Sequence, residues 1–174
     1  MSSRMVLGAI ALILLIGCQV QPSPESSSQP TSSPATSQAE VPAASGERFA
    51  TVTEVEVTAG EPGAYTFVVT VQSPDTGCDQ YADWWEVLSE EGELIFRRTL
   101  AHSHVNEQPF SRPGGAVEIQ PDQLVIVRAH MNPQGYGTQA MQGTVETGFE
   151  QVSLPEKFAA DLAESELQPQ GCEF

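Results

Sequence analysis

The sequence predicts an all-β fold, an antiparallel β-sandwich of the immunoglobulin-like type with about seven strands and a short C-terminal helix. Runs rich in β-branched and aromatic residues recur about every 8 to 15 residues over the later part of the chain. Clusters of glycine and proline, which are typical of turns, separate these runs. Only one stretch has the spacing of an amphipathic helix, so no helices are expected between the strands.

The expected strands are joined by recognisable turns. The first run, FATVTEVEV, alternates in polarity, and AGEPG follows it as a turn. EEG separates two later runs as a hairpin turn would, and QPD separates another two. NPQGYGT must form a turn or loop, and Gly143 indicates a bulge in the last run. The expected strands are residues 49–57, 64–72, 84–89, 93–101, 116–119, 123–131 and 139–149.

Residues 155–166 predict the single helix. Pro155 stands in the first turn, where a missing backbone N–H costs little. Phe158 and Leu162 lie along one face at helical spacing, and that face would pack against the sandwich.

Two adjacent tryptophans lie near the start of the third expected strand. Successive strand residues point to opposite faces, so Trp84 and Trp85 cannot both face the same layer. We expect one to lie in the core and the other to be at least partly exposed, and we take Trp85 as the candidate ligand platform.

The N-terminal segment is typical of an export signal. Arg4 precedes an apolar run, residues 6–17, that is too short to span a bilayer as a helix. The run ends in Leu-Ile-Gly-Cys, which resembles the lipobox of bacterial lipoproteins. The resemblance implies that residues 1–17 are removed and that Cys18 becomes a diacylated N-terminus. The alternatives are an ordinary signal peptide or an uncleaved anchor. In that family, Gln19 after the cysteine favours the outer membrane if the host has one.

Two further regions follow the predicted signal. Residues 18–48 are rich in serine, proline, glutamine and alanine, so they cannot bury enough surface to fold and should form a disordered tether. Residues 49–174 are enough for one domain with its own core, the β-sandwich. A formal charge of −16 at pH 7 repels nucleic acid, which we exclude as a partner. The expected partner is the membrane, reached through the lipid anchor.

The cysteine count predicts a disulfide. If Cys18 carries lipid, Cys78 and Cys172 remain as an even pair in an exported domain. A metal or redox pair is the alternative, although the CxxC spacing typical of such pairs is absent.

The three histidines form a candidate metal site. If the strand over 93–101 continues, His102 and His104 share one face, and His130 on a neighbouring strand could supply a third ligand. Three imidazoles suit zinc or copper, and Glu107 could be a fourth ligand or orient one of the histidines. The alternative is that the histidines end strands and bind loop backbone.

Arginine is concentrated in the same part of the chain. Apart from Arg4 the sequence has six lysine and arginine residues, and four of them lie between positions 97 and 128. They could pair with local acids such as Asp83, Glu86 and Glu107, bind a small anion bidentately, or tune a metal site. The candidate ligand-binding arginines are Arg98, Arg112 and Arg128.

Residues 78–149 resemble a group of uncharacterised secreted or lipid-anchored bacterial proteins, through the segments CDQYADWWEVLSEEGELIFRRTLAHSHVNEQPFSRPGG and VRAHMNPQGYG. The resemblance implies no activity. GxSxG, HExxH and a phosphate-binding glycine loop are absent from the sequence, which therefore favours a non-enzymatic protein over a hydrolase. The sequence predicts a lipid-anchored cell-envelope module, either a binding protein for copper, zinc or a small anion, or a structural protein.

Overall fold

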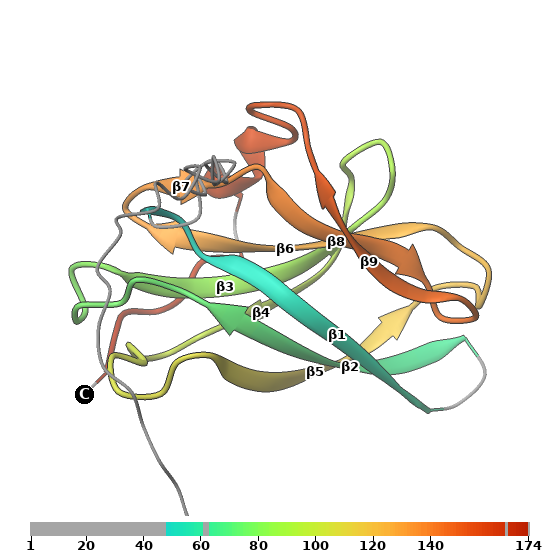
Figure 1. The fold of residues 1–174 in the computed structure, drawn as a ribbon, viewed down its shortest axis with the longest axis horizontal. Coiled ribbons are helices and arrows are strands. Elements are labelled where there is room, and N and C mark those ends of the chain that lie inside the picture. Colours follow the sequence, from blue (N-terminus) through green and yellow to red (C-terminus); the bar gives the residue numbers. More distant parts are fainter. Residues whose placement is uncertain (1–47, 61–62, 166, 174) are drawn as a thin grey trace, which may run out of the picture. The chain divides into compact units, whose positions relative to one another are not determined.

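The computed structural model describes residues 48–60, 63–165 and 167–173 (Figure 1). All of them belong to one compact unit, Glu40–Phe174. The predicted signal peptide with Cys18, and the predicted tether up to residue 47, lie outside the described residues.

The fold is an antiparallel β-sandwich, as the sequence predicts. One sheet has three strands in the order β1-β2-β5, and the other has the order β4-β3-β6-β8-β9 with the short β7 paired to β6. The two sheets are separate layers in Figure 1. The strands are β1 (Thr51–Ala59), β2 (Ala64–Gln72), β3 (Tyr81–Leu88), β4 (Leu94–Thr99), β5 (Phe110–Glu118), β6 (Val125–Asn132), β7 (Gly135–Tyr136), β8 (Gln139–Thr144) and β9 (Gly148–Ser153).

Two of the expected strands differ in the structure. The run over 139–149 is not one bulged strand but the hairpin β8–β9, in which Thr144 pairs with Gly148 across the turn. Gly148 has a φ of 80°, which glycine adopts without strain. Strand β5 begins at Phe110 rather than at 116, and it includes Pro113. Proline is tolerated there because β5 is an edge strand that pairs only with β2.

The expected C-terminal helix is shorter than predicted. The structure has a 3-10 helix, η2 (Ala160–Glu164), instead of an α-helix over 155–166. Lys157 and Ala159 have φ values of 63° and 43°, and this left-handed backbone prevents an α-helix from starting at Pro155.

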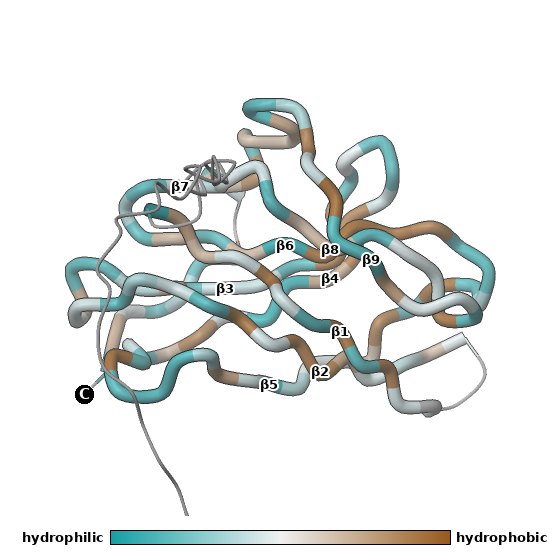
Figure 2. The backbone as a smooth tube through the Cα atoms, viewed as in Figure 1, coloured by the Kyte–Doolittle hydropathy of each residue, from teal (hydrophilic) through white to brown (hydrophobic). Residues whose placement is uncertain are grey.

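The main core lies between the sheets and includes Phe67, Trp85, Phe110 and Val127. Figure 2 shows apolar residues recurring along the strands. At Gly114 of β5 a Cβ atom would lie 2.7 Å from Cζ2 of Trp85, so glycine lets the indole pack against the opposite sheet. Trp85 is 0% exposed.

The central strands of the larger sheet are buried on both faces. All eight residues of β3 and seven of the eight in β6 are buried. Their second face is covered by the chain after β9, because Leu154, Phe158 and Leu162 pack against a second cluster that contains Leu88, Ile126 and Ala140. The expectation of one partly exposed tryptophan is therefore wrong, since Trp84 on this second face is 1% exposed.

Candidate functional site

The covered face of the larger sheet carries a buried ion cluster, here called the outer-face cluster: Glu86, Arg97 and Arg128. The strand register places Glu86 of β3 opposite Arg97 of β4 and Arg128 of β6. Arg97 Nη2 donates to Glu86 Oε2 at 2.6 Å, and Arg128 Nε donates to Oε1 at 2.8 Å. Each oxygen of the buried carboxylate is therefore paired with a guanidinium group.

The same two arginines bind the C-terminal segment. Arg97 donates to the carbonyl oxygens of Leu162 and Leu167 at 2.8 and 3.0 Å. Arg128 donates to the carbonyl oxygens of Phe158 and Ala159. The outer-face cluster thus supplies donors to carbonyl groups that are outside any sheet, and it fixes the segment over the sheet.

Aromatic rings enclose this cluster. The guanidinium carbon of Arg128 lies 3.5 Å from the ring centre of Tyr136, and that of Arg97 lies 4.4 Å from the ring of Trp84. Burial, and then the charge of Glu86, raise the pKa of Tyr136. The phenol therefore stays protonated and accepts a hydrogen bond from Trp84 Nε1 at 3.2 Å.

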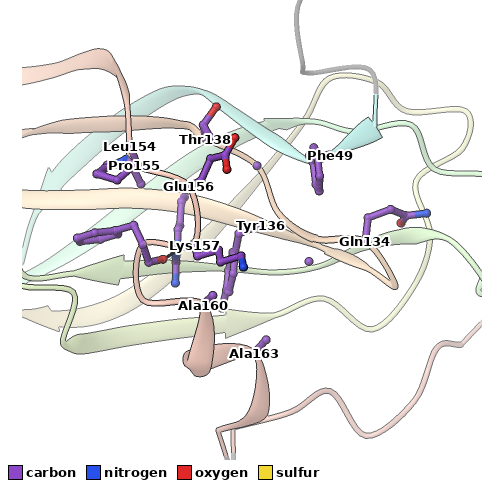
Figure 3. Close-up of a pocket in the computed structure, with 14 residues that line it drawn as sticks. Phe49, Gln134, Tyr136, Thr138, Leu154, Pro155, Glu156, Lys157, Ala160 and Ala163 are labelled. Atoms are coloured by element: carbon purple, nitrogen blue, oxygen red, sulfur yellow. Dashed lines mark hydrogen bonds between the residues drawn. The ribbon is translucent and has the colours of Figure 1, made fainter.

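A cavity of about 440 Å³ opens beside the outer-face cluster, between the β6–β7 hairpin and the segment after β9 (Figure 3). Figure 3 shows that Lys157 and Glu156 project beside Tyr136, with Phe49 on the opposite wall. Lys157 is the single lysine of the sequence and is exposed. The apolar walls are Phe49, Tyr136, Leu154, Pro155, Phe158, Ala160 and Ala163.

His130 lies against Tyr136 of the cavity wall, with ring centres 4.7 Å apart, and its polar partner is Asp83. Its Nδ1 lies 2.6 Å from Asp83 Oδ1, and its ring stacks on Trp84 with centres 3.8 Å apart. The carboxylate fixes the orientation of the imidazole. Within the described ranges, no serine, threonine or cysteine side chain forms a hydrogen bond with His130. The pair is thus a histidine whose ring orientation is set by a carboxylate.

The other two histidines lie together, in the loop between β4 and β5, which we call the histidine loop (residues 100–109). Strand β4 ends at Thr99, so they do not share a strand face. Their ring centres are nevertheless 4.6 Å apart. His102 is exposed, whereas His104 is buried and stacks on Phe110 at 3.7 Å.

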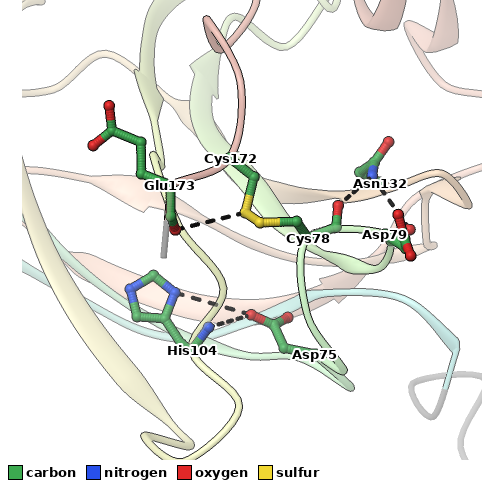
Figure 4. The surroundings of a disulfide bond; sticks show 7 residues. All are labelled: Asp75, Cys78, Asp79, His104, Asn132, Cys172 and Glu173. Atoms are coloured by element: carbon green, nitrogen blue, oxygen red, sulfur yellow. Dashed lines mark hydrogen bonds and ion pairs between the residues drawn. A yellow bond between two sulfur atoms is a disulfide. The ribbon is translucent and has the colours of Figure 1, made fainter.

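Asp75 lies beside His104 and organises the histidine loop (Figure 4). Its Oδ2 accepts a hydrogen bond from the backbone N–H of His104 at 2.8 Å, and its Oδ1 accepts from Ser73 and from Ala82 N. Its Oδ2 is 3.9 Å from His104 Nδ1. Burial, together with Arg112 and His102, lowers the pKa of His104, while Asp75 opposes that shift.

The structure does not bring the three histidines into one group. Among residues 48–60, 63–165 and 167–173, no three His, Cys, Asp or Glu side chains are arranged to hold a metal ion. The three-histidine metal site therefore stays a prediction that the geometry does not support.

The residues predicted to bind a ligand also lie in different parts of the domain and do not form one site. Arg98 is exposed and donates to the carbonyl oxygens of Thr99 and Pro113. Arg112 binds the exposed Glu107 through both Nη atoms. Arg128 belongs to the outer-face cluster, and the buried Trp85 is not accessible to a ligand. Arg112 and Arg128 each pair with a nearby acid, which is the alternative that the sequence left open for the arginines.

The sequence interpretation named Glu86 only as one acid with which the arginines could pair, and it left Arg97 and Tyr136 out of the candidate site. One available signal was strand alternation, because Trp84 and Glu86 occupy the same face of a run that is otherwise apolar. A carboxylate on such a strand needs cationic partners from neighbouring strands.

The predicted disulfide is present. Cys78 and Cys172 are joined across a sequence separation of 94, and Figure 4 shows the bond beside His104 and Glu173. It ties the end of the chain to the loop that precedes β3.

Comparison with known proteins gives one informative relative. The chain is 38% identical over 101 residues to a protein of Halomicrobium mukohataei named putative lipoprotein. The match covers 58% of this chain, and the chain spans about half the length of that relative. No family model and no solved structure matches. In the part of the chain that the structure describes, no helix is long and apolar enough to cross a membrane.

Proposed function

We propose that the protein is a lipid-anchored component of the cell envelope that presents a non-enzymatic binding domain. The observation that supports the anchor is the similarity to a putative lipoprotein, together with the Leu-Ile-Gly-Cys sequence before residue 19. Lipidation at Cys18 would fasten the chain by two or more acyl chains, which is enough for stable membrane attachment. A tether over 18–48 would then hold the sandwich near the membrane, on the outer membrane in a host that has one.

The anchor is tested by labelling the full chain with a palmitate analogue in a bacterial expression host. Cys18→Ser should abolish labelling and release the protein from the membrane fraction. Cys78→Ser is the matched control, and it should remain labelled and membrane-bound. Label retained in Cys18→Ser would refute lipidation at this position.

The binding role rests on the cavity of Figure 3, which supports the small-anion alternative. Its volume of about 440 Å³ is within the usual range for small-molecule sites. The walls are apolar, and the exposed Lys157 at the edge offers positive charge on a chain whose formal charge is −16. The ligand class that fits is a small carboxylic acid with an apolar body. Of the two cations among the described residues that line the cavity, Arg128 is already bound to Glu86 and two carbonyl groups, which leaves Lys157 to bind an anion.

Octanoate and its neutral counterpart octanamide test the cavity. We expect octanoate to bind more tightly, and Lys157→Gln to reduce its affinity about two- to fivefold, as for an exposed charge interaction. Lys157→Arg should keep the preference, and octanamide should not distinguish the variants. Equal binding of both compounds to the wild type would refute the proposed charge recognition.

A further inference from the structure

The side chain of His104 is buried without hydrogen-bond partners. Both ring nitrogens are inaccessible to solvent and unpaired within the described residues, although the backbone N–H of the same residue is bound to Asp75. Leaving buried polar atoms unpaired lowers the stability of the fold, because they give up hydrogen bonds to water and gain none in the protein. A polar residue retained at that cost next to a surface cavity indicates a partner that the protein chain does not supply.

A partner can approach the imidazole of His104 from one side only. On one side the imidazole of His104 stacks on Phe110, and Asp75 Oδ2 is 3.9 Å from its Nδ1. A carboxylate near Nδ1 favours a proton on that nitrogen and leaves Nε2 as the lone-pair donor. His104 also lines a surface cavity of about 680 Å³, which is shared with His102, Glu107 and Glu173.

The disulfide holds Glu173 at this cavity. Cys172 is bonded to Cys78, and the backbone N–H of Glu173 donates to the carbonyl oxygen of Ala101 at 2.6 Å. Figure 4 shows Glu173 on the same side of the disulfide as His104. The backbone of Glu173 is thus kept at the cavity that His102 and His104 also line.

We propose that His102, His104 and Glu173 form a binding site for one divalent transition-metal ion, zinc or copper(II), with Asp75 orienting His104. Two imidazoles and a carboxylate are a ligand set that both ions accept. Nitrogens that share one zinc ion lie roughly 3–3.5 Å apart, because Zn–N bonds are about 2.0–2.1 Å and the geometry is tetrahedral. Ring centres 4.6 Å apart are compatible with that spacing.

The ion completes the site by reorienting two exposed side chains. The three groups do not surround a common point in the structure. His102 and Glu173 are exposed and can change rotamer at small cost, and the ring of His104 has to shift along Phe110 until Nε2, which is buried in the structure, reaches the cavity. This proposal differs from the three-histidine site, because His130 is replaced by Glu173.

The test is a calorimetric titration of the full-length chain in detergent with Zn²⁺ and then with Cu²⁺. The wild type should bind one ion, and His102→Gln should weaken binding at least tenfold. Glu173→Gln should weaken binding severalfold. Both residues are exposed, so neither change should unfold the domain, and a circular-dichroism melt checks this. Cobalt(II) absorption reports whether the ion is tetrahedral.

Two further variants complete the design. His130→Gln should leave metal affinity unchanged, and a drop equal to that of His102→Gln would overturn the proposed ligand set. Cys78→Ser/Cys172→Ser should weaken binding about as much as Glu173→Gln, because the tail is then released. Absence of binding by the wild type, or binding insensitive to His102→Gln, would also overturn the proposal. None of these outcomes depends on the lipid anchor or on the cavity at Lys157.

Discussion

The outer-face cluster and the histidine loop each contain buried polar side chains, but they differ in whether those side chains have hydrogen-bond partners. In the outer-face cluster, the two oxygens of Glu86 are paired with Arg97 and Arg128, which also bind four carbonyl groups. In the histidine loop, neither ring nitrogen of His104 has a hydrogen-bond partner among the residues that the structure describes. A saturated cluster has no capacity left for a ligand, whereas an unsaturated one does.

This difference assigns separate roles to two regions that the sequence grouped together. The arginines of the outer-face cluster stabilise the fold by holding the C-terminal segment over β3 and β6. The histidine loop has one buried imidazole, His104, beside the exposed His102, and it is the part of the domain to which the proposed metal ion would bind. Four predictions test the distinction, from the largest expected effect to the smallest.

Arg97→Gln should lower the free energy of unfolding by about 3–5 kcal/mol, because it leaves part of a buried carboxylate uncompensated. Arg98→Gln is the matched control at the adjacent position, and it should cost less than about 1 kcal/mol because Arg98 is exposed. Urea denaturation measures both. Similar losses in the two variants would contradict a structural role specific to the outer-face cluster.

Cys78→Ser/Cys172→Ser should lower the free energy of unfolding by about 2–4 kcal/mol, since the bond closes a loop with a sequence separation of 94. Amide exchange should accelerate near Glu173 but remain slow at residues 158–165, where the arginines bind the segment. If protection were lost along the whole segment, the disulfide rather than the outer-face cluster would be what holds it.

His104→Phe should raise the free energy of unfolding by about 1–3 kcal/mol in the absence of metal, because it removes two unpaired buried nitrogens and keeps the stack on Phe110. The substitution should also remove the dependence of the unfolding free energy on pH that His104 contributes. The folded pKa of His104 lies below the ordinary value of 6.5, so the unfolded chain binds the extra proton first as the pH falls. The stability of the wild type should therefore be complete above pH 6.5 and decrease as the pH falls through 6.5 towards the folded pKa.

Glu107→Gln should change the free energy of unfolding by less than about 1 kcal/mol, because Glu107 and Arg112 form an exposed ion pair. Arg112 holds the pKa of Glu107 below its ordinary value through a hydrogen bond. The variant should also leave zinc affinity within about twofold. A larger loss of affinity would add Glu107 to the proposed ligands and so redefine the histidine loop site.

The sequence by itself determined the features that depend on local pattern. Alternation with period two, interrupted by glycine and proline, predicted the antiparallel sandwich, and the even cysteine pair predicted the Cys78–Cys172 bond. Strand alternation also showed that Trp84 and Trp85 face different layers. The hairpin at Thr144–Gly148 and the strand through Pro113 were missed, because turn and edge positions depend on the neighbouring strand.

Only the tertiary structure decided which polar residues meet. Strand register pairs Glu86 with Arg97 and Arg128, and nothing local to any of these strands specifies that register. The same holds for the cover over the larger sheet, because the segment after β9 packs against Leu88, Ile126 and Ala140, which lie far from it along the chain. The alternation of side chains is a property of one strand, whereas strand order and the burial of a second face depend on contacts between distant segments. Those contacts place His130 apart from His102 and His104.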